Sequence, residues 1–218
     1  MLIAAMAFTA CSKKEGGSGG SSGGGSASVS VSKATPASDF SYELTADKSG
    51  VLIKGYSGNG GIVIIPATIE DMPVKEIGGS AFSGSARDLE RPTNRITEIV
   101  VPDSVVKIEA GAFNNMQNLT KATLPNGVKK IGEIFRGCKK LTTVNLPTSL
   151  EVITTLAFHE CSELNNLIIP DSINSVRFAH DTGVDLLDMP DNSAFVGCGK
   201  LPLATRAKIE AWGYTSGF

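Results

Sequence analysis

The feature that most constrains this sequence is a repeat of 22 or 23 residues. Such a repeat is one supersecondary unit that cannot bury its apolar face alone, so successive units must stack. We therefore predict five stacked coils, numbered one to five along the chain, with additional residues inside the first and the last. The prolines that mark them are Pro66, Pro102, Pro125, Pro147 and Pro170, and the phenylalanines are Phe82, Phe113, Phe135, Phe158 and Phe195.

Each coil begins with a short segment of alternating polarity. In coil four, Val144 and Leu146 alternate with Thr143 and Asn145. A period of two is typical of a strand with one buried face. The proline that follows lacks an N–H and ends the strand. We expect the strands of successive coils to pair in parallel as one curved sheet. A second apolar segment then turns the chain back, and the repeat phenylalanine fills the interior.

From Ile131 to Pro170 the sequence follows, almost in full, the pattern Ile-Gly-x-x-Ala-Phe-x-x-Cys-x-x-Leu-x-x-Val-x-Leu-Pro. This pattern closely resembles the treponemal-type leucine-rich repeats of bacterial surface proteins, and the resemblance extends over residues 40 to 214. It implies a leucine-rich repeat solenoid that contacts other molecules, often host matrix proteins or neighbouring cells. Coil one has Ser85 and coil two has Met116 where the family has cysteine, and coil five carries an insertion.

Both ends of a solenoid need a cover. Residues 40 to 56 alternate in polarity on either side of the turn sequence Asp-Lys-Ser-Gly, which predicts a β-hairpin as the N-terminal cap. Residues 203 to 212 have a helix-forming composition, which predicts a short helix as the C-terminal cap. The predicted fold class is therefore α/β, a leucine-rich repeat solenoid with a curved parallel sheet between two caps.

Residues 1 to 11 form an apolar run that is too short to span a bilayer and ends at Cys11. The run resembles the end of a bacterial lipoprotein signal peptide, with Phe8-Thr9-Ala10-Cys11 as a relaxed lipobox. We therefore predict that Cys11 is lipidated. The basic region of such a signal is not among these residues, which leaves open a start upstream. The alternative is a buried strand with an incidental cysteine.

Residues 12 to 39 are rich in glycine and serine and cannot form a core. As a flexible coil, a segment of about 28 residues has a root-mean-square reach of roughly 30 Å. We therefore predict three parts: a signal remnant over residues 1–11, a flexible tether over residues 12–39 and a leucine-rich repeat domain over residues 40–218.

The outward-facing side chains of the expected sheet form the candidate partner-binding surface. Where a strand only meets water, these positions should be polar. Ile62, Ile64, Val100 and Ile168 depart from this rule, and adjacent exposed apolar residues mark interaction surfaces. The alternative is that a cap or the coil-five insertion covers them. The ten candidates are Ile62, Ile64, Glu98, Val100, Lys121, Thr123, Thr143, Asn145, Asn166 and Ile168.

Three of the four cysteines, Cys138, Cys161 and Cys198, each follow a repeat phenylalanine by three residues. They should form one row of buried free thiols, because free cysteine behaves as a small hydrophobic residue. Side chains in register point in the same direction, which argues against disulfides between coils.

No set of residues indicates catalysis. His159 falls in a variable gap of the repeat, and His180 with the aspartates of the insertion matches no calcium or zinc spacing. Asp181-Thr182-Gly183 spells the aspartic protease triplet, but that chemistry needs two such aspartates and the triplet occurs once. We therefore expect no enzyme activity, no metal site and no cofactor. The net charge of −2 does not indicate nucleic-acid binding.

These features together predict a non-catalytic, lipid-anchored protein of the bacterial cell envelope, on the outer surface or in the periplasmic leaflet. It would bind protein partners through the concave sheet, and host matrix components are the partners that the resemblance implies. The alternatives are a periplasmic structural or assembly protein and a carrier of a small apolar ligand beneath the insertion, near Phe178. The basic side chains of coil three either meet an acidic partner or form a solvated convex face.

Overall fold

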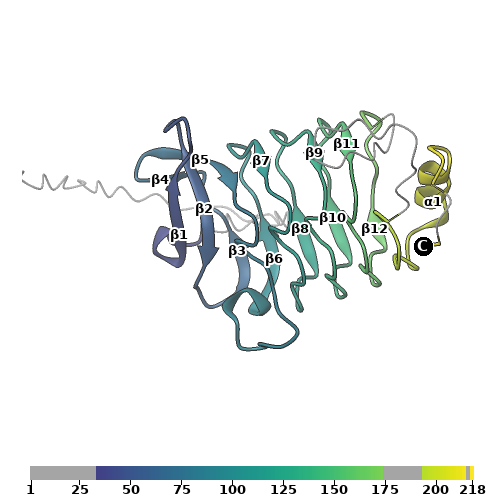
Figure 1. The fold of residues 1–218 in the computed structure, drawn as a ribbon, viewed down its shortest axis with the longest axis horizontal. Coiled ribbons are helices and arrows are strands. Elements are labelled where there is room, and N and C mark those ends of the chain that lie inside the picture. The colour runs from purple at the N-terminus through teal and green to yellow at the C-terminus, as the bar shows by residue number, and fades with distance from the viewer. Residues whose placement is uncertain (1–32, 174–192, 215–216) are drawn as a thin grey trace, which may run out of the picture. The chain divides into compact units, whose positions relative to one another are not determined.

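The computed structural model describes residues 33–173, 193–214 and 217–218. The coils lie side by side between a pair of N-terminal strands and a C-terminal helix (Figure 1). The helical elements are the 3-10 turns η1 (Ala37–Asp39) and η2 (Pro92–Arg95) and the helix α1 (Leu203–Glu210). The strands are β1 (Phe40–Leu44), β2 (Val51–Tyr56), β3 (Gly61–Ile64), β4 (Thr68–Ile69), β5 (Met72–Ile77), β6 (Ile96–Val100), β7 (Lys107–Ile108), β8 (Lys121–Thr123), β9 (Lys130–Ile131), β10 (Thr143–Asn145), β11 (Val152–Ile153) and β12 (Asn166–Leu167).

One parallel sheet contains the first strand of every coil, in the order β12-β10-β8-β6-β3 (Figure 1). Each strand has an inward-pointing residue that is buried and lies between outward-facing neighbours, as the alternation predicts. These residues are Val63, Ile99, Ala122, Val144 and Leu167. The predicted parallel sheet of a leucine-rich repeat is therefore confirmed.

The second apolar segment also forms a strand in coils one to four, which the sequence did not lead us to expect. β7 pairs in parallel with β5, and β11 pairs in parallel with β9. Backbone bonds of 2.9 Å from Val106 N–H to Lys75 O and from Glu109 N–H to Ile77 O extend the first of these pairs. Coils one to four therefore each have a strand on two sides, and the turn predicted here contributes to short second ladders, β5 with β7 and β9 with β11.

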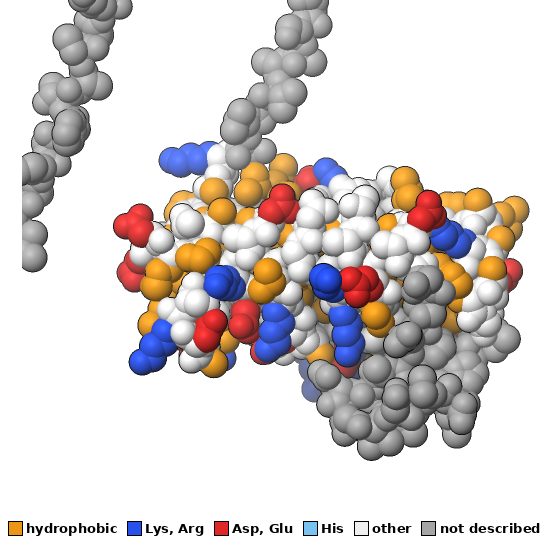
Figure 2. Space-filling view, turned by 90° about the horizontal axis from the view of Figure 1, so that it is seen from above, with side chains coloured by type: hydrophobic (Ala, Val, Ile, Leu, Met, Phe, Trp, Pro, Cys, Tyr) orange, Lys and Arg blue, Asp and Glu red, His pale blue; other side chains and the backbone are white. Residues whose placement is uncertain are grey.

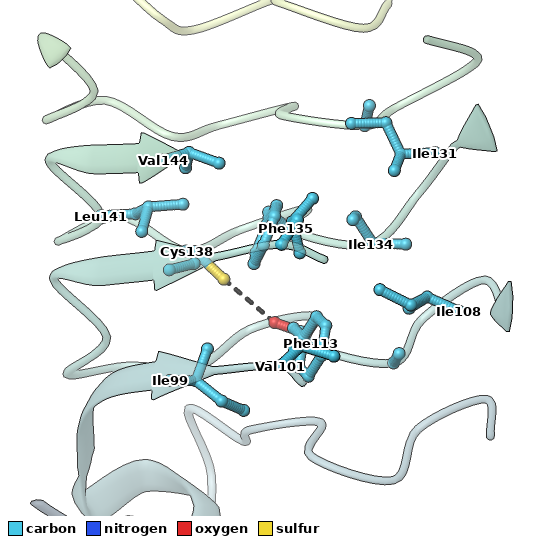
Figure 3. Packing of buried hydrophobic residues seen from close by; sticks show 14 of the residues in the cluster. Ile99, Val101, Ile108, Phe113, Ile131, Ile134, Phe135, Cys138, Leu141 and Val144 are labelled. Carbon is cyan, nitrogen blue, oxygen red and sulfur yellow. Dashed lines mark hydrogen bonds between the residues drawn. The ribbon is translucent and has the colours of Figure 1, made fainter. Parts of the chain in front are cut away.

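A row of phenylalanine rings runs through the interior of the coils, and Figure 3 shows two of its members, Phe113 and Phe135. The rings of neighbouring coils lie 5.5 to 5.8 Å apart, centroid to centroid. All five repeat rings are fully buried. Phe40 extends the row at the N-terminal end, and Tyr214 followed by Phe218 extends it at the other. The phenylalanine repeat of the sequence therefore becomes a continuous aromatic row that reaches both caps.

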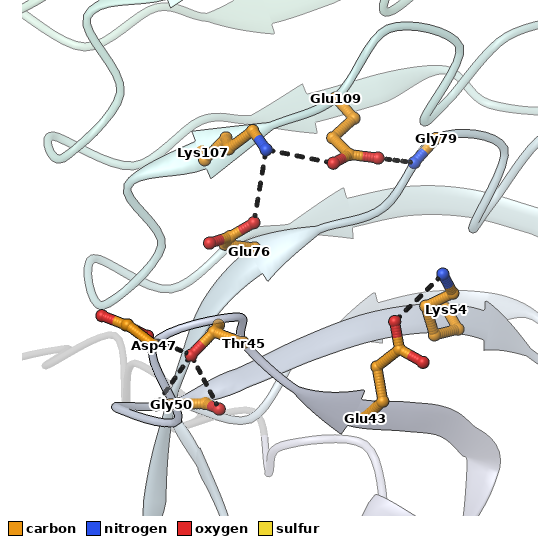
Figure 4. A network of polar contacts seen from close by, with 9 residues as sticks. All are labelled: Glu43, Thr45, Asp47, Gly50, Lys54, Glu76, Gly79, Lys107 and Glu109. Atoms are coloured by element: carbon orange, nitrogen blue, oxygen red, sulfur yellow. Dashed lines mark hydrogen bonds and ion pairs between the residues drawn. The ribbon is translucent and has the colours of Figure 1, made fainter.

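The N-terminal cap is the predicted hairpin of β1 and β2, which pair antiparallel. Its turn is held by Asp47, whose carboxylate accepts hydrogen bonds from the Ser49 and Thr45 hydroxyls and from the Ser49 N–H. These bonds hold the pKa of Asp47 well below its usual range. An ion pair of 3.2 Å between Lys54 and Glu43 joins the two strands (Figure 4). The C-terminal cap is α1, which buries Ile209.

Hydroxyl groups tie each coil to the one before it. Thr120 Oγ1 donates to Thr97 O, and Thr142 Oγ1 donates to Thr120 O, both at 2.9 Å. On the far side of the proline, Ser149 and Ser172 donate in the same way to carbonyls of the preceding coil. At Thr97 and Thr120 the hydroxyl is a further donor to a carbonyl that already accepts a backbone N–H of the next coil, so it adds to the ladder between coils.

Candidate partner-binding surface

The register of the sheet brings the ten sequence-predicted candidates onto one face, which we call the sheet face. Paired strands place them in two rows that cross the sheet. Ile168 follows β12 by one residue and lies at the end of the second row. The first row is Ile62, Glu98, Lys121, Thr143 and Asn166, and the second is Ile64, Val100, Thr123, Asn145 and Ile168.

Exposed apolar side chains lie at both ends of the sheet face. Ile62 on β3 is 61% exposed and Ile168 beside β12 is 79% exposed. Ile64 and Val100 are half-buried, so they offer less surface than the alternation alone suggests. The sheet face therefore has two apolar ends, of which the β3 end is the broader.

The middle of the sheet face is polar and carries no net charge. Lys121 Nζ on β8 lies 2.7 Å from Glu98 Oε1 on β6, and Asn145 Nδ2 donates to Thr123 Oγ1 at 3.1 Å. A partly exposed ion pair of this kind adds about 1 kcal/mol or less to stability. Its main effect here is that the sheet face offers hydrogen-bonding groups without an excess of either charge.

Five basic residues of coil three, which the sequence groups together, have acidic or amide partners in their own or neighbouring coils. Lys129 pairs with Glu151 at 3.0 Å and Lys139 with Glu160 at 4.0 Å. Seen from above, basic and acidic side chains lie next to one another instead of forming a patch of one sign (Figure 2). Coil three therefore does not present the basic surface that an acidic partner would need. The remaining pairs are Lys121 with Glu98, Arg136 with Glu133 and Lys140 with Asn118.

A similar network joins coils one and two (Figure 4). Lys107 Nζ lies 3.1 Å from Glu109 and 3.5 Å from Glu76. The other carboxylate oxygen of Glu109 accepts the Gly79 N–H at 2.9 Å. This N–H and the Lys107 ammonium hold the pKa of the Glu109 carboxyl below its usual value, and the Glu109 and Glu76 carboxylates raise the pKa of Lys107. The network links coils and leaves no group with the strong perturbation typical of catalysis.

A groove of about 920 Å³ lies on the side of the second ladders, between residues 106–110, 127–133 and 154–156. Its lining mixes apolar residues, among them Val106, Ile108 and Leu156, with five charged ones, Lys107, Lys129, Lys130, Glu109 and Glu133. Sites for small apolar ligands are lined predominantly by apolar and aromatic side chains. This groove therefore does not support the carrier alternative. The position predicted for that ligand, near Phe178, lies outside the described residues.

The cysteine row is confirmed as buried and free. Each thiol donates to the carbonyl of the repeat phenylalanine one coil earlier. Cys138 Sγ lies 3.1 Å from Phe113 O (Figure 3), and Cys161 and Cys198 repeat this contact at 3.1 Å with Phe135 and Phe158. Burial raises the pKa of Cys138 and of Cys198 to about 12. The row is therefore a structural ladder of unreactive thiols.

The described ranges show no arrangement suited to metal binding. Among residues 33–173, 193–214 and 217–218, no three His, Cys, Asp or Glu side chains gather as a cation site. Within the same ranges, no helix has the length and apolar character of a membrane span. His159 is half-buried in coil four. His180, Asp181 and the lipidation candidate Cys11 lie outside the described residues.

Comparison with known proteins identifies the repeats. Residues 90–201 match the model of the BspA type leucine rich repeat region, in six copies. The leucine-rich repeat protein of T. pallidum is 27% identical with a TM-score of 0.60, over 85% of this chain and 99% of that one. A leucine-rich repeat protein from Bacteroides ovatus is also 27% identical, with a TM-score of 0.53, over 75% of this chain and 44% of that one. A search of curated proteins finds no match.

Proposed function

Because the chain belongs to the BspA-type leucine-rich repeat family, we propose that it is a non-catalytic binding protein of the bacterial cell envelope that contacts protein partners through its sheet face. Stacked repeats in general create extended binding surfaces. The observation that carries the proposal is the sheet face itself, with Ile62 and Ile168 exposed at its two ends. Two apolar side chains at the ends of a face that can form hydrogen bonds in its middle suit a protein partner, because protein–protein interfaces combine buried apolar contacts with polar ones.

The proposal includes a lipid anchor at Cys11 and a tether that holds the repeat domain away from the membrane. Its support is the lipobox-like sequence before Cys11 and the glycine- and serine-rich segment after it. We further propose that the domain faces the cell exterior and that host matrix proteins are its partner class. Protease treatment of intact cells tests the location, because only a domain outside the outer surface would be cleaved.

Lysine substitutions at the two ends of the sheet face test the binding surface. Ile62→Lys and Ile168→Lys should each weaken binding to an array of purified host matrix proteins by about tenfold, because each buries a charge where an apolar anchor was. Both side chains are mostly exposed, so the fold should be retained. The measurement is the equilibrium dissociation constant for each protein that binds the unchanged chain.

The matched control is Val106→Lys. Val106 is 57% exposed and lies beside β7, among the second ladders and not on the sheet face. This control should bind like the unchanged protein. Equal binding by all three variants, or an equal loss in the control, would remove the sheet face from the proposal.

The anchor is tested separately with Cys11→Ser. In detergent phase partition of membranes from an expressing bacterium, the unchanged protein should enter the detergent phase and the variant the aqueous phase. The reason is that acyl chains on Cys11 would supply the membrane affinity, and more than one is needed for stable anchoring. Identical partition of the two proteins would contradict lipidation at this residue.

A further inference from the structure

α1 occupies the position in which a sixth strand of the parallel sheet would lie. Leu201 follows Cys198 by three residues, as Leu141 and Leu164 follow the cysteines before them. After Leu164 the chain enters β12, and the N–H groups of Asn165 and Asn166 donate to Thr142 O. After Leu201 comes Pro202, which has no N–H to donate, and the helix begins one residue later. The ladder therefore stops at β12.

Side chains of α1 take the place of this missing strand. Thr205 Oγ1 donates to Leu167 O at 3.1 Å, and Lys208 Nζ donates to Ile169 O at 3.0 Å. Lys208 also pairs with Asp171 at 2.6 Å. Thr205 and Lys208 are three residues apart and so share one side of the helix. They donate to the carbonyl groups of Leu167 and Ile169, which a further strand of the sheet would otherwise bind.

The opposite edge of the sheet, β3, is blocked by a single residue. Thr35 N–H donates to Ile64 O at 2.9 Å, and Ile64 N–H donates to Thr35 Oγ1 at 3.0 Å. These two bonds occupy both backbone groups of Ile64. The sheet is therefore closed at both edges by segments that are not strands.

The two edges are complementary to each other. All five strands are parallel, and β3 pairs with β6 through one edge only. The free edge of β3 therefore has the direction and register that a strand would need to pair with the free edge of β12. A second copy with its β3 against β12 would continue both rows of the sheet face. Asn166 would then adjoin Ile62 of the second copy, and Ile168 would adjoin Ile64. The exposed apolar side chains of the sheet face are concentrated at these edges, where such a contact would cover them.

We propose that β3 and β12 are two halves of a self-association surface whose partner is a second copy of this chain, and that Thr35, Thr205 and Lys208 hold the segments that keep this surface closed. Unpaired strand edges are templates for pairing with another chain, and folded proteins usually cover them. A contact between two different edges is heterologous, so it would produce chains of molecules instead of closed dimers.

The test must open both edges, because β12 of one copy can pair only with a free β3 of another. In the variant, Thr35→Pro removes the N–H and the hydroxyl that bind Ile64, and Thr205→Val with Lys208→Met removes the two donors of α1 while keeping their size. Hydrogen exchange should become faster in α1, and sedimentation should show mass that increases with protein concentration, by at least about twofold as chains form. The matched control is Lys200→Met, which breaks an exposed ion pair with Glu163 and touches no strand carbonyl. It should remain like the unchanged protein in both measurements.

Adding Ile168→Lys to the variant with both edges open tests the register, because a lysine at a strand edge opposes pairing. This added substitution should restore the mass of the unchanged protein. Three results would overturn the proposal: unchanged exchange in α1, faster exchange without association, or association that persists with Lys at position 168. None of these results affects the binding test of the proposed function, which uses Ile62→Lys and Ile168→Lys as single substitutions.

Discussion

Replacing Phe135 with alanine is expected to lower the free energy of unfolding by about 3–5 kcal/mol. The ring is fully buried and stacks between Phe113 and Phe158, at 5.5 and 5.8 Å. The neighbouring coils are held in place by backbone bonds, among them Phe135 N–H to Ala157 O at 3.1 Å. The cavity left by the ring therefore has little room to collapse. Denaturant unfolding followed by circular dichroism measures the loss.

Leu203→Ala provides the control for this substitution. Leu203 is 82% exposed at the start of α1, so its truncation should change the unfolding free energy by about 0.5 kcal/mol or less. A loss below about 1 kcal/mol for Phe135→Ala would show that the aromatic row does not hold the coils together.

The thiols of the cysteine row should be inert in the folded protein. With Cys11→Ser as background, a pulse of iodoacetamide at pH 8 should modify none of Cys138, Cys161 and Cys198 until the chain unfolds. Burial raises the pKa of Cys138 and Cys198 to about 12, whereas an ordinary thiol has a pKa of about 8.5. The thiolate fraction, which is the reactive form, is therefore lower by about a thousandfold or more. Mass spectrometry at increasing denaturant concentration counts the modified residues.

The raised pKa values of Cys138 and Cys198 also make the stability of the fold depend on pH. The folded state binds the thiol proton more tightly than the unfolded state, so the row stabilises the fold fully below about pH 8.5 and loses this contribution as the pH rises toward 12. Modification of the folded protein at the rate of a free thiol would contradict the burial of the row.

The parts of the fold that repeat could be predicted from the sequence. Residues equivalent to Phe135 and Val144 occur in every coil, so the repeat pattern alone identifies which side chains fill the interior. Alternation along each strand likewise identified the residues of the sheet face. The hairpin cap was predictable from its own local pattern, because the turn around Asp47 separates two segments of alternating polarity.

The contacts between coils could not be predicted in this way. β9 and β11 have two residues each, which is too short for a period of two to be recognised. The repeat of 22 residues places Lys129 and Glu151 at equivalent positions of neighbouring coils, but it does not specify that these two exposed side chains pair. The bonds of Thr205 and Lys208 to β12 depend on where α1 docks, which the helix-forming composition does not specify.

The hydroxyl and thiol bonds between coils all have the same direction along the chain. Thr120, Thr142 and Ser172 donate to carbonyls of the preceding coil, and the three cysteines do the same. The acceptors of each coil thus belong to a part of the chain that is synthesised earlier. A newly made coil therefore finds the acceptors for its hydroxyl and thiol groups already in place, and in turn supplies carbonyls to the coil before it, as Ala157 O does to Phe135 N–H. We expect the folded region to grow by addition, one turn at a time, outward from the N-terminal hairpin.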